Sequence, residues 1–234
     1  QVEALFQRDS AVEKGLEKES RSAYLQSSYI DKWAGFPLYQ NTQTKYYSCG
    51  EEMFPDMLEA LRGAKHFIFL EYFIIEEGYM FNTILDILEE KAKAGVDVRF
   101  IYDDVGSINS ISFGYYKKLQ ERGIPCVTFN PFKPLISVVM NNRDHRKIFV
   151  VDGYIGFTGG INLADEYINK VKRFGYWKDT GVRIEGEAVW SLTAMFLEMW
   201  NYINRSTEDY SRFLPSVYRE KEFTSDGFVQ PYGD

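Results

Sequence analysis

Cysteine and histidine are the scarcest reactive residues in this sequence. Two cysteines, Cys49 and Cys126, and two histidines, His66 and His145, occur among 234 residues. The cysteines match neither a metal-ligand nor a redox spacing, so we expect reduced, buried thiols. With so few ligands of these types, a metal site built from His and Cys is not expected, and no cofactor is implied.

Blocks of basic residues and long apolar runs are also lacking. The net charge of −7 argues against a protein that binds nucleic acid by neutralising its phosphates. The longest apolar run, FIFLEYFII over 67–75, is about half the length of a membrane span and contains Glu71. No signal peptide is visible, and the sequence begins with Gln1 instead of Met. We therefore expect a piece of a longer protein, from which membrane segments are missing.

Strands and amphipathic helices alternate along most of the sequence. The apolar spacing predicts helices over 50–65, 82–95, 113–123 and 187–203, and strands over 66–75, 96–104 and 124–130. Residues 36–50 are expected to form short strands joined by a polar turn. This alternation is typical of βαβ units, so the predicted fold class is α/β, with a mostly parallel mixed sheet sandwiched between helices. Residues 1–30 are expected to be a connector or helix, 31–214 one domain, and 215–234 a linker.

The segment HRKIFVVDGYIGFTGGIN predicts a β-hairpin at Asp152-Gly153, a dipeptide typical of a two-residue turn. In that register His145 faces Gly160, Lys147 faces Thr158, and Arg143 faces Asn162. Residues that are directly opposed, or two apart on one strand, point to the same side of a sheet. We therefore expect His145, Lys147, Thr158, Gly160 and Asn162 to share one face, with open space at Gly160 in front of the imidazole.

These residue types suit chemistry at a phosphodiester. A neutral imidazole is a competent nucleophile, and its pKa near neutrality also suits proton transfer. Lys147 would place a positive charge beside the non-bridging oxygens, and Asn162 would donate an N–H. Fixed donors at those oxygens favour the transition state over the ground state without requiring a metal ion.

The spacing H-x-K-x4-D-x6-G-G-x-N, from His145 to Asn162, resembles the HKD signature of the phospholipase D superfamily. The flanks NNRDHRKIFVVDG, GFTGGINLADEY and YWKDTGVRIEG are similar to those of bacterial cardiolipin synthases, as are LEYFI, YDDVGS and GFVQPYGD. The resemblance extends over most of the chain from about Tyr29 onward.

The resemblance assigns a role to each matching residue. His145 would be the nucleophile that forms a phosphatidyl-histidine, or the acid/base if a partner domain supplies the nucleophile. Lys147 and Asn162 would bind phosphate oxygens. Asp152, although part of the catalytic motif, would be mainly architectural, and Asp179 in YWKDTG would orient His145. Many members carry a hydroxyl at the position of Gly160, so one oxygen ligand is missing here.

The superfamily pairs two HKD motifs across a pseudo-twofold axis, whereas this chain has one. The resemblance therefore implies the first catalytic half of a cardiolipin synthase, with 215–234 leading towards a missing second domain. Two phosphatidylglycerol molecules would be its substrates. The partners would be a membrane surface and a second HKD domain of the same chain or of a homodimer. The full-length protein would belong to a bacterial cell membrane, whereas this fragment would be soluble and nearly inactive alone.

Two other functions stay open from the sequence. One is a phosphodiesterase or nuclease that acts as a homodimer, which the acidic net charge disfavours because no nucleic acid is expected to bind. The other is a catalytically idle module that binds phosphate.

Several further residues have competing interpretations. Glu71 either pairs with a cation or lies at the ligand-binding edge of the sheet, and we favour a supporting role in the site. The polar residues of YDDVGS, namely Tyr102, Asp103, Asp104 and Ser107, are either further residues of the site or an ordinary polar loop at the end of a strand. The apolar segment 130–142 is either a core strand or a lip that touches acyl chains. His66 lacks the partners of His145 and is interpreted as structural. Positive charge gathers over 141–178, with seven basic against four acidic residues.

Overall fold

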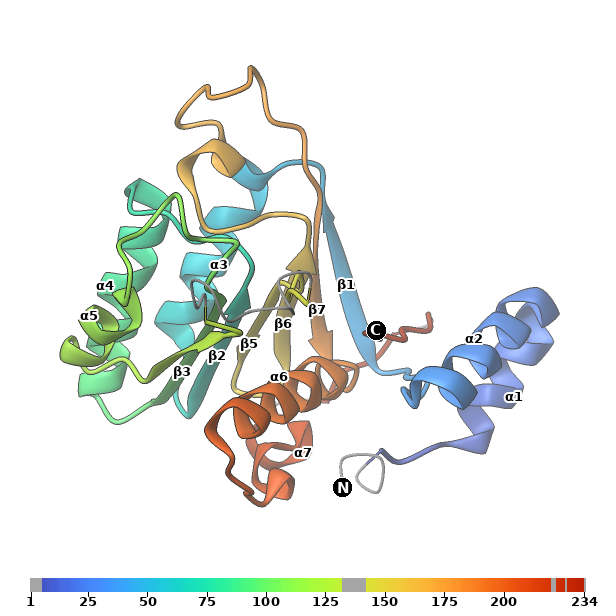
Figure 1. Ribbon diagram of the computed structural model, residues 1–234. Coiled ribbons are helices and arrows are strands. Elements are labelled where there is room, and N and C mark those ends of the chain that lie inside the picture. The colour runs from blue at the N-terminus through green and yellow to red at the C-terminus, as the bar shows by residue number, and fades with distance from the viewer. Residues whose placement is uncertain (1–5, 132–141, 220–221, 226, 234) are drawn as a thin grey trace.

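The computed structural model describes residues 6–131, 142–219, 222–225 and 227–233. Seven strands in these ranges form one mixed sheet in the order β1-β7-β6-β5-β2-β3-β4 (Figure 1). Their bounds are β1 Thr42–Tyr47, β2 Phe67–Tyr72, β3 Asp97–Asp103, β4 Cys126–Phe129, β5 Ile148–Val151, β6 Ile155–Gly159 and β7 Gly181–Gly186.

The α/β class and the mixed sheet between helices are confirmed, but the neighbouring strands are less parallel than predicted. Over the described residues, β2–β3 and β3–β4 pair in parallel, while the other four neighbouring pairs are antiparallel. The reason is that β5 and β7 run opposite to the remaining strands and lie between them. The βαβ pattern therefore covers only the β2–β4 half of the sheet. Strand β7 was not predicted, because its sequence GVRIEG is short and has glycine at both ends.

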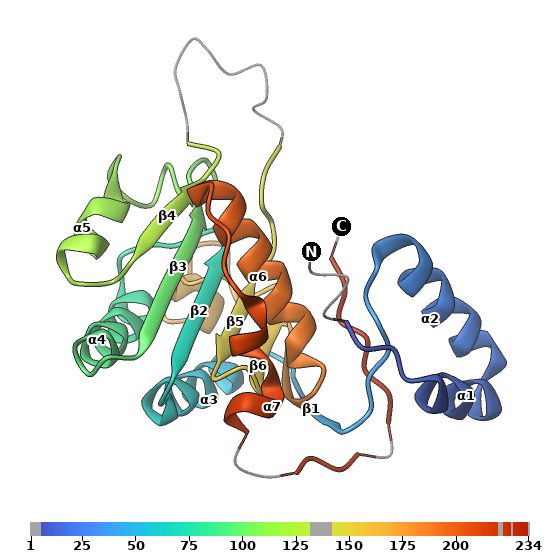
Figure 2. The ribbon, with the colours of Figure 1, turned by 90° about the horizontal axis from the view of Figure 1, so that it is seen from below.

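Helices cover both faces of the sheet, as Figure 2 shows. On one face α3 (Gly50–Gly63), α4 (Tyr79–Lys93) and α5 (Tyr115–Glu121) bury apolar side chains against Ile68, Leu70 and Phe149. On the other face α6 (Val189–Asn204) packs on Phe69 and Val150, with Trp190, Met195 and Leu197 buried. The nearly continuous apolar sequence of β2 supplies both cores, because successive side chains point to opposite faces.

The N-terminal region forms two helices, α1 (Ser10–Glu19) and α2 (Arg21–Ala34), which stand beside the β1 edge of the sheet (Figures 1 and 2). Near the other terminus lie a 3-10 turn, η3 (Tyr210–Phe213), and a short helix, α7 (Pro215–Tyr218). The C-terminal segment returns to α2, since Val229 pairs with Tyr39 and the Gln230 side chain donates to Ser27 O and Phe36 O. Within the described ranges, no helix combines the length and apolar character needed to cross a membrane. Cys49 and Cys126 are both buried, free thiols, as expected.

The predicted hairpin forms, but its register is one residue away from the prediction. Phe149 pairs with Phe157 and Val151 with Ile155, so the turn contains three residues, Asp152 to Tyr154. Asp152 stays bound to β2, because its N–H donates to Phe67 O over 2.9 Å. Asp152 and Gly153 both adopt positive φ, at 51° and 73°, and Gly153 does so at no steric cost. The face predicted to hold His145, Lys147, Thr158, Gly160 and Asn162 is therefore not produced by strand pairing.

Candidate active site

His145, Lys147 and Asn162 gather around the segment Phe73–Ile75, which continues β2 beyond its last hydrogen-bonded residue. Chain residues 161–163 run beside this segment, with a parallel bridge between Ile75 and Leu163. Leu163 N–H donates to Ile74 O over 3.1 Å. The chain reaches this place by leaving β6 at Gly159, where φ is 142°. A bend after the strand, instead of the hairpin register, thus brings Asn162 towards His145 and Lys147.

His145 precedes β5 and is exposed to solvent. Its ring lies 4.7 Å from the ring of Phe73, tilted by 58°. Partial desolvation lowers the pKa of His145, and the charge of Lys147 lowers it further, against the opposing charges of Asp144 and Asp103. The neutral, nucleophilic imidazole is therefore favoured at neutral pH.

Lys147 is buried, with 5% of its surface exposed. Its ammonium donates to His145 O over 2.7 Å and lies 5.5 Å from the centre of the Phe73 ring. Burial lowers the pKa of Lys147 to about 8, although the carboxylates of Asp144 and Asp179 raise it. A bound anion would supply the negative charge that favours the ammonium form.

Asn162 is buried and its amide orientation is fixed from both sides. The carbonyl oxygen accepts from Ile74 N–H over 3.0 Å, and the amide nitrogen donates to the Tyr167 hydroxyl over 2.9 Å. Because the amide carries two N–H groups, one remains for an anion.

Open space at Gly160 in front of the imidazole was predicted, but the side chain of Asp179 fills it. A Cβ atom built at this position would lie 2.1 Å from the carboxylate of Asp179. Asp179 accepts from the Trp177 indole N–H and from Thr180 N–H. Within the described part of the chain no hydrogen bond joins Asp179 to His145, and its charge acts on Lys147. The orienting role that the resemblance assigns to Asp179 stays a prediction.

Asp152 lies at the other end of β5, away from His145. Its carboxylate accepts three backbone N–H groups, those of Lys65, His66 and Phe67, over 2.7–2.8 Å. These bonds attach the hairpin to the start of β2. The side chain thus lies away from the imidazole of His145, and the mainly architectural role expected for it stays a prediction.

Glu71 is fully buried and pairs with a cation, one of the two alternatives considered. Arg146 Nε lies 2.8 Å from a Glu71 oxygen and 3.1 Å from an Asp144 oxygen. Burial raises the pKa of Glu71 well above its usual range, Arg146 opposes this, and Asp144 adds to it. Glu71 thus holds the residue after His145, on the α6 side of the sheet.

Two residues of the YDDVGS segment hold the backbone next to the site. Asp103 is buried and accepts from Asp144 N–H over 3.0 Å, which fixes the chain just before His145. The Ser107 hydroxyl accepts from Ile75 N–H and donates to Phe73 O. Tyr102, by contrast, accepts from Tyr116 N–H inside the core, and Asp104 N–H donates to Phe129 O.

Sequence reasoning missed four residues of this site: Phe73, Arg146, Tyr167 and Trp177. Arg146 could have been found, because a buried Glu71 requires a cation and Arg146 is part of the motif segment. The others depend on the bend after Gly159, which the sequence pattern does not reveal. Of segment 130–142, residues 132–141 lie outside the described residues, and with them the choice between core strand and lip.

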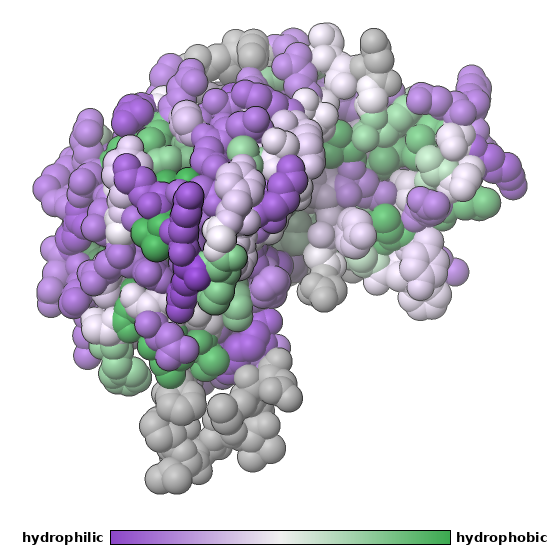
Figure 3. Space-filling view, turned by 90° about the horizontal axis from the view of Figure 1, so that it is seen from above, coloured by the Kyte–Doolittle hydropathy of each residue, from purple (hydrophilic) through white to green (hydrophobic). Residues whose placement is uncertain are grey.

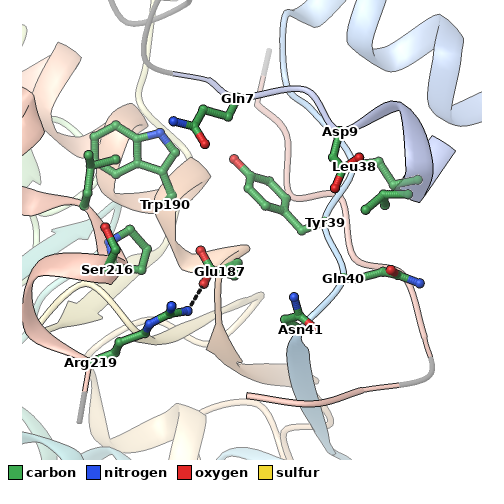
Figure 4. Close-up of a pocket in the computed structure, with 13 residues that line it drawn as sticks. Gln7, Asp9, Leu38, Tyr39, Gln40, Asn41, Glu187, Trp190, Ser216 and Arg219 are labelled. Atoms are coloured by element: carbon green, nitrogen blue, oxygen red, sulfur yellow. Dashed lines mark hydrogen bonds and ion pairs between the residues drawn. The ribbon is translucent and has the colours of Figure 1, made fainter. Parts of the chain in front are cut away.

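A cavity of about 360 Å³ lies at the opposite end of the sheet, lined by Tyr39, Glu187, Trp190 and Arg219 among others (Figure 4). Strand β7 runs between the two places, since Gly181 pairs with Gly159 near the site and Gly186 pairs with Thr42 near the cavity. His66, stacked on Tyr218 with ring centres 4.3 Å apart, lies at the Asp152 end of β5, away from His145. Its structural interpretation agrees with this placement.

Comparisons with known proteins agree on one family. The family described as "Cardiolipin synthase, PLD-like domain" matches residues 57–200. A cardiolipin synthase of Alkalihalophilus pseudofirmus is 43% identical over 196 residues, covering 83% of this chain and 38% of that protein. An uncharacterized protein of Streptococcus mutans is 44% identical over 233 residues, covering 100% of this chain and 50% of that protein.

A solved structure shares the fold. Phosphatidylserine synthase from Haemophilus influenzae superposes with a TM-score of 0.54 at 18% identity, covering 84% of this chain and 44% of that one. The chain thus spans half or less of the length of these relatives.

Proposed function

Because the chain belongs to the family of cardiolipin synthases with a phospholipase D-like domain, we propose that it is the first catalytic half of such an enzyme. The enzyme would transfer a phosphatidyl group between two phosphatidylglycerol molecules through a phospho-histidine. The observation that supports this best is an exposed imidazole whose own backbone carbonyl accepts from a buried ammonium.

The reaction is a double displacement at phosphorus. His145 attacks the phosphorus of one phosphatidylglycerol, the bond from phosphorus to the glycerol oxygen breaks, and glycerol leaves with a proton from an acid. The free hydroxyl of a second phosphatidylglycerol then loses its proton to a base and attacks the phosphorus. The bond from phosphorus to nitrogen breaks, which gives cardiolipin and restores His145.

Lys147 and Asn162 would bind the non-bridging oxygens, on which charge builds up in each displacement. Both side chains are held before substrate arrives, Lys147 by His145 O and Asn162 by Ile74 and Tyr167. Such preorganised donors stabilise the transition state without reorganising during the reaction.

A second HKD motif would supply the acid and base for the leaving and attacking hydroxyls. Either a further domain of the same protein or a second copy of this chain would fill that role. The isolated chain is therefore expected to convert phosphatidylglycerol slowly unless two copies pair.

The test uses the native protein that carries this chain, with phosphatidylglycerol labelled in its glycerol headgroup. We expect a burst of glycerol equal to the enzyme concentration before cardiolipin accumulates. His145→Ala should abolish both glycerol release and cardiolipin formation, whereas His66→Ala should keep them. Normal cardiolipin formation by His145→Ala would refute the proposal. Cleavage of single-stranded DNA instead of transfer to lipid would favour the nuclease alternative.

A further inference from the structure

The loop that precedes β7 exposes apolar side chains beside the candidate site. It follows the 3-10 turn η2 (Asp165–Ile168) and rises above the sheet as the long orange loop in Figure 1. Phe174 is 73% exposed, Tyr176 64% and Val171 51%. Large apolar residues this exposed and this close together in one loop are unusual on a surface that contacts only water.

The same loop is strongly basic. Four basic residues and no acidic one lie between 170 and 178, in a chain whose net charge is −7. Lys172 and Lys178 are exposed, whereas Arg173 lies within 4 Å of Glu76 and Glu166. Lys170 lies 4.1 Å from the ring centre of Tyr79, itself 50% exposed. Figure 3, seen from this end, shows hydrophobic and hydrophilic side chains interleaved.

The base of the loop is held firmly. Asn169 accepts from Trp177 N–H over 2.6 Å and donates to Trp177 O over 3.0 Å, which closes the loop. Phe174 lies against Trp177 with ring centres 6.0 Å apart, and the Trp177 indole donates to Asp179. The exposed tip therefore connects through one side chain to the carboxylate that covers Gly160.

We propose that loop 170–178 is an interfacial anchor that inserts into the surface of a bilayer containing anionic phospholipid. The proposal rests on the proposed function, because it explains how a lipid phosphate reaches the site. Aromatic and apolar side chains interleaved with lysines fit the region between headgroups and acyl chains, where lysine ammonium groups contact anionic phosphates. The anchor would hold Asn162 and Asp179 at the level of the headgroups.

The alternative to a bilayer is that the C-terminal segment of the same chain covers this loop. The turn η2 packs against α3 and α4, on one face of the sheet. Gly233, the last described residue, lies next to Met195 of α6 and near Arg146, on the opposite face. The C-terminal segment therefore does not cover the anchor.

The test is sedimentation of the purified 234-residue chain with vesicles of phosphatidylcholine, alone or mixed with phosphatidylglycerol. We expect binding to mixed vesicles that weakens with added salt. The pair Phe174→Ser and Tyr176→Ser should weaken it by about tenfold or more. The pair Lys172→Gln and Lys178→Gln should weaken binding to mixed vesicles by about twentyfold and leave the weak binding to phosphatidylcholine unchanged.

The matched control is the pair Leu25→Ser and Tyr29→Ser, which removes two equally exposed apolar side chains from α2. It should bind vesicles like the unmodified chain. The proposal is overturned if the loop variants bind normally, or if the α2 variant loses binding instead. It is also overturned if the Phe174 and Tyr176 changes dissociate a dimer in the absence of vesicles, because the occupant is then a second copy.

Two further measurements keep folding and function separate from anchoring. Thermal melting should be unchanged, since the substituted side chains are exposed. If the serine pair melts early, a fluorophore on Tyr176→Cys replaces it, and an emission spectrum unmoved by mixed vesicles then overturns the proposal. Failure of the glycerol burst alongside loop-dependent vesicle binding would refute the proposed function and leave the anchor standing.

Discussion

The two ends of strand β5 carry residues of the same motif but have opposite physical properties. At the turn end, Asp152 is 1% exposed and its carboxylate accepts three backbone N–H groups. At the open end, the side chain of His145 is exposed and contacts the Phe73 ring. The first arrangement buries the carboxylate among backbone N–H groups, whereas the second leaves a reactive ring accessible. Fixed spacing within a motif therefore need not mean a shared chemical role.

The largest expected effect is on catalysis at the open end. In the native protein, His145→Ala should lower kcat/KM by at least about a thousandfold, because a nucleophile or acid/base group is removed. The free energy of unfolding should change little, since the side chain is exposed. Steady-state kinetics and urea unfolding of the same preparations check both statements. If His145→Ala lowered the free energy of unfolding by as much as it raised the activation free energy, the two ends of β5 would not differ in this way.

The next largest effect is on stability at the turn end. Asp152→Ala leaves three backbone N–H groups without their acceptor and should lower the free energy of unfolding by roughly 3 kcal/mol or more. Molecules that remain folded should keep most of their kcat/KM. Asp86→Ala serves as control, because the Asp86 side chain is 75% exposed in its pair with Arg122. This substitution should lower the free energy of unfolding by about 1 kcal/mol or less. Urea unfolding measures both.

The pH dependence should also come from the open end. The pKa of Lys147 is lowered to about 8, so kcat/KM should fall above that pH as the ammonium loses its proton. The pKa of His145 is lowered from 6.5, so the acidic limb, where the imidazole becomes protonated, should lie below that value. Lys147→Arg should remove the alkaline limb at the expense of some activity. A profile of the unmodified enzyme that stays flat well above pH 8 would contradict this role.

The smallest expected effect concerns Gly160. Gly160→Ala would displace the Asp179 carboxylate. Because Asp179 interacts with Lys147 and Trp177, kcat/KM should fall by about tenfold. The free energy of unfolding should change little. Gly63→Ala is the control, since an added Cβ there has nothing within 4 Å and Gly63 ends α3. If both substitutions leave kcat/KM unchanged, Asp179 is not part of the working site.

The sequence predicted much of this molecule where one local pattern decides the structure. The β2–β4 half follows from strands alternating with amphipathic helices, and Asp152-Gly153 correctly marks a hairpin. The register was missed because the bonds from Asp152 to β2 are long-range and lengthen the turn to three residues. The position of Asn162 was missed for a similar reason, since the bend after Gly159 and the bridge from Leu163 to Ile75 depend on tertiary contacts. The motif could be recognised in the sequence, but the geometry of its residues could not be predicted from it.

Titration of the two histidines with inorganic phosphate shows whether the open end of β5 binds an anion. The chain carries one histidine at the site and one far from it, so His66 is an internal control for His145. In the imidazole NMR spectrum, phosphate should shift the His145 signals saturably and leave those of His66 in place, and Lys147→Ala should abolish the shift. If the His145 signals do not shift, or if both rings respond equally, the open end of β5 does not bind phosphate and the role proposed for His145 and Lys147 is refuted.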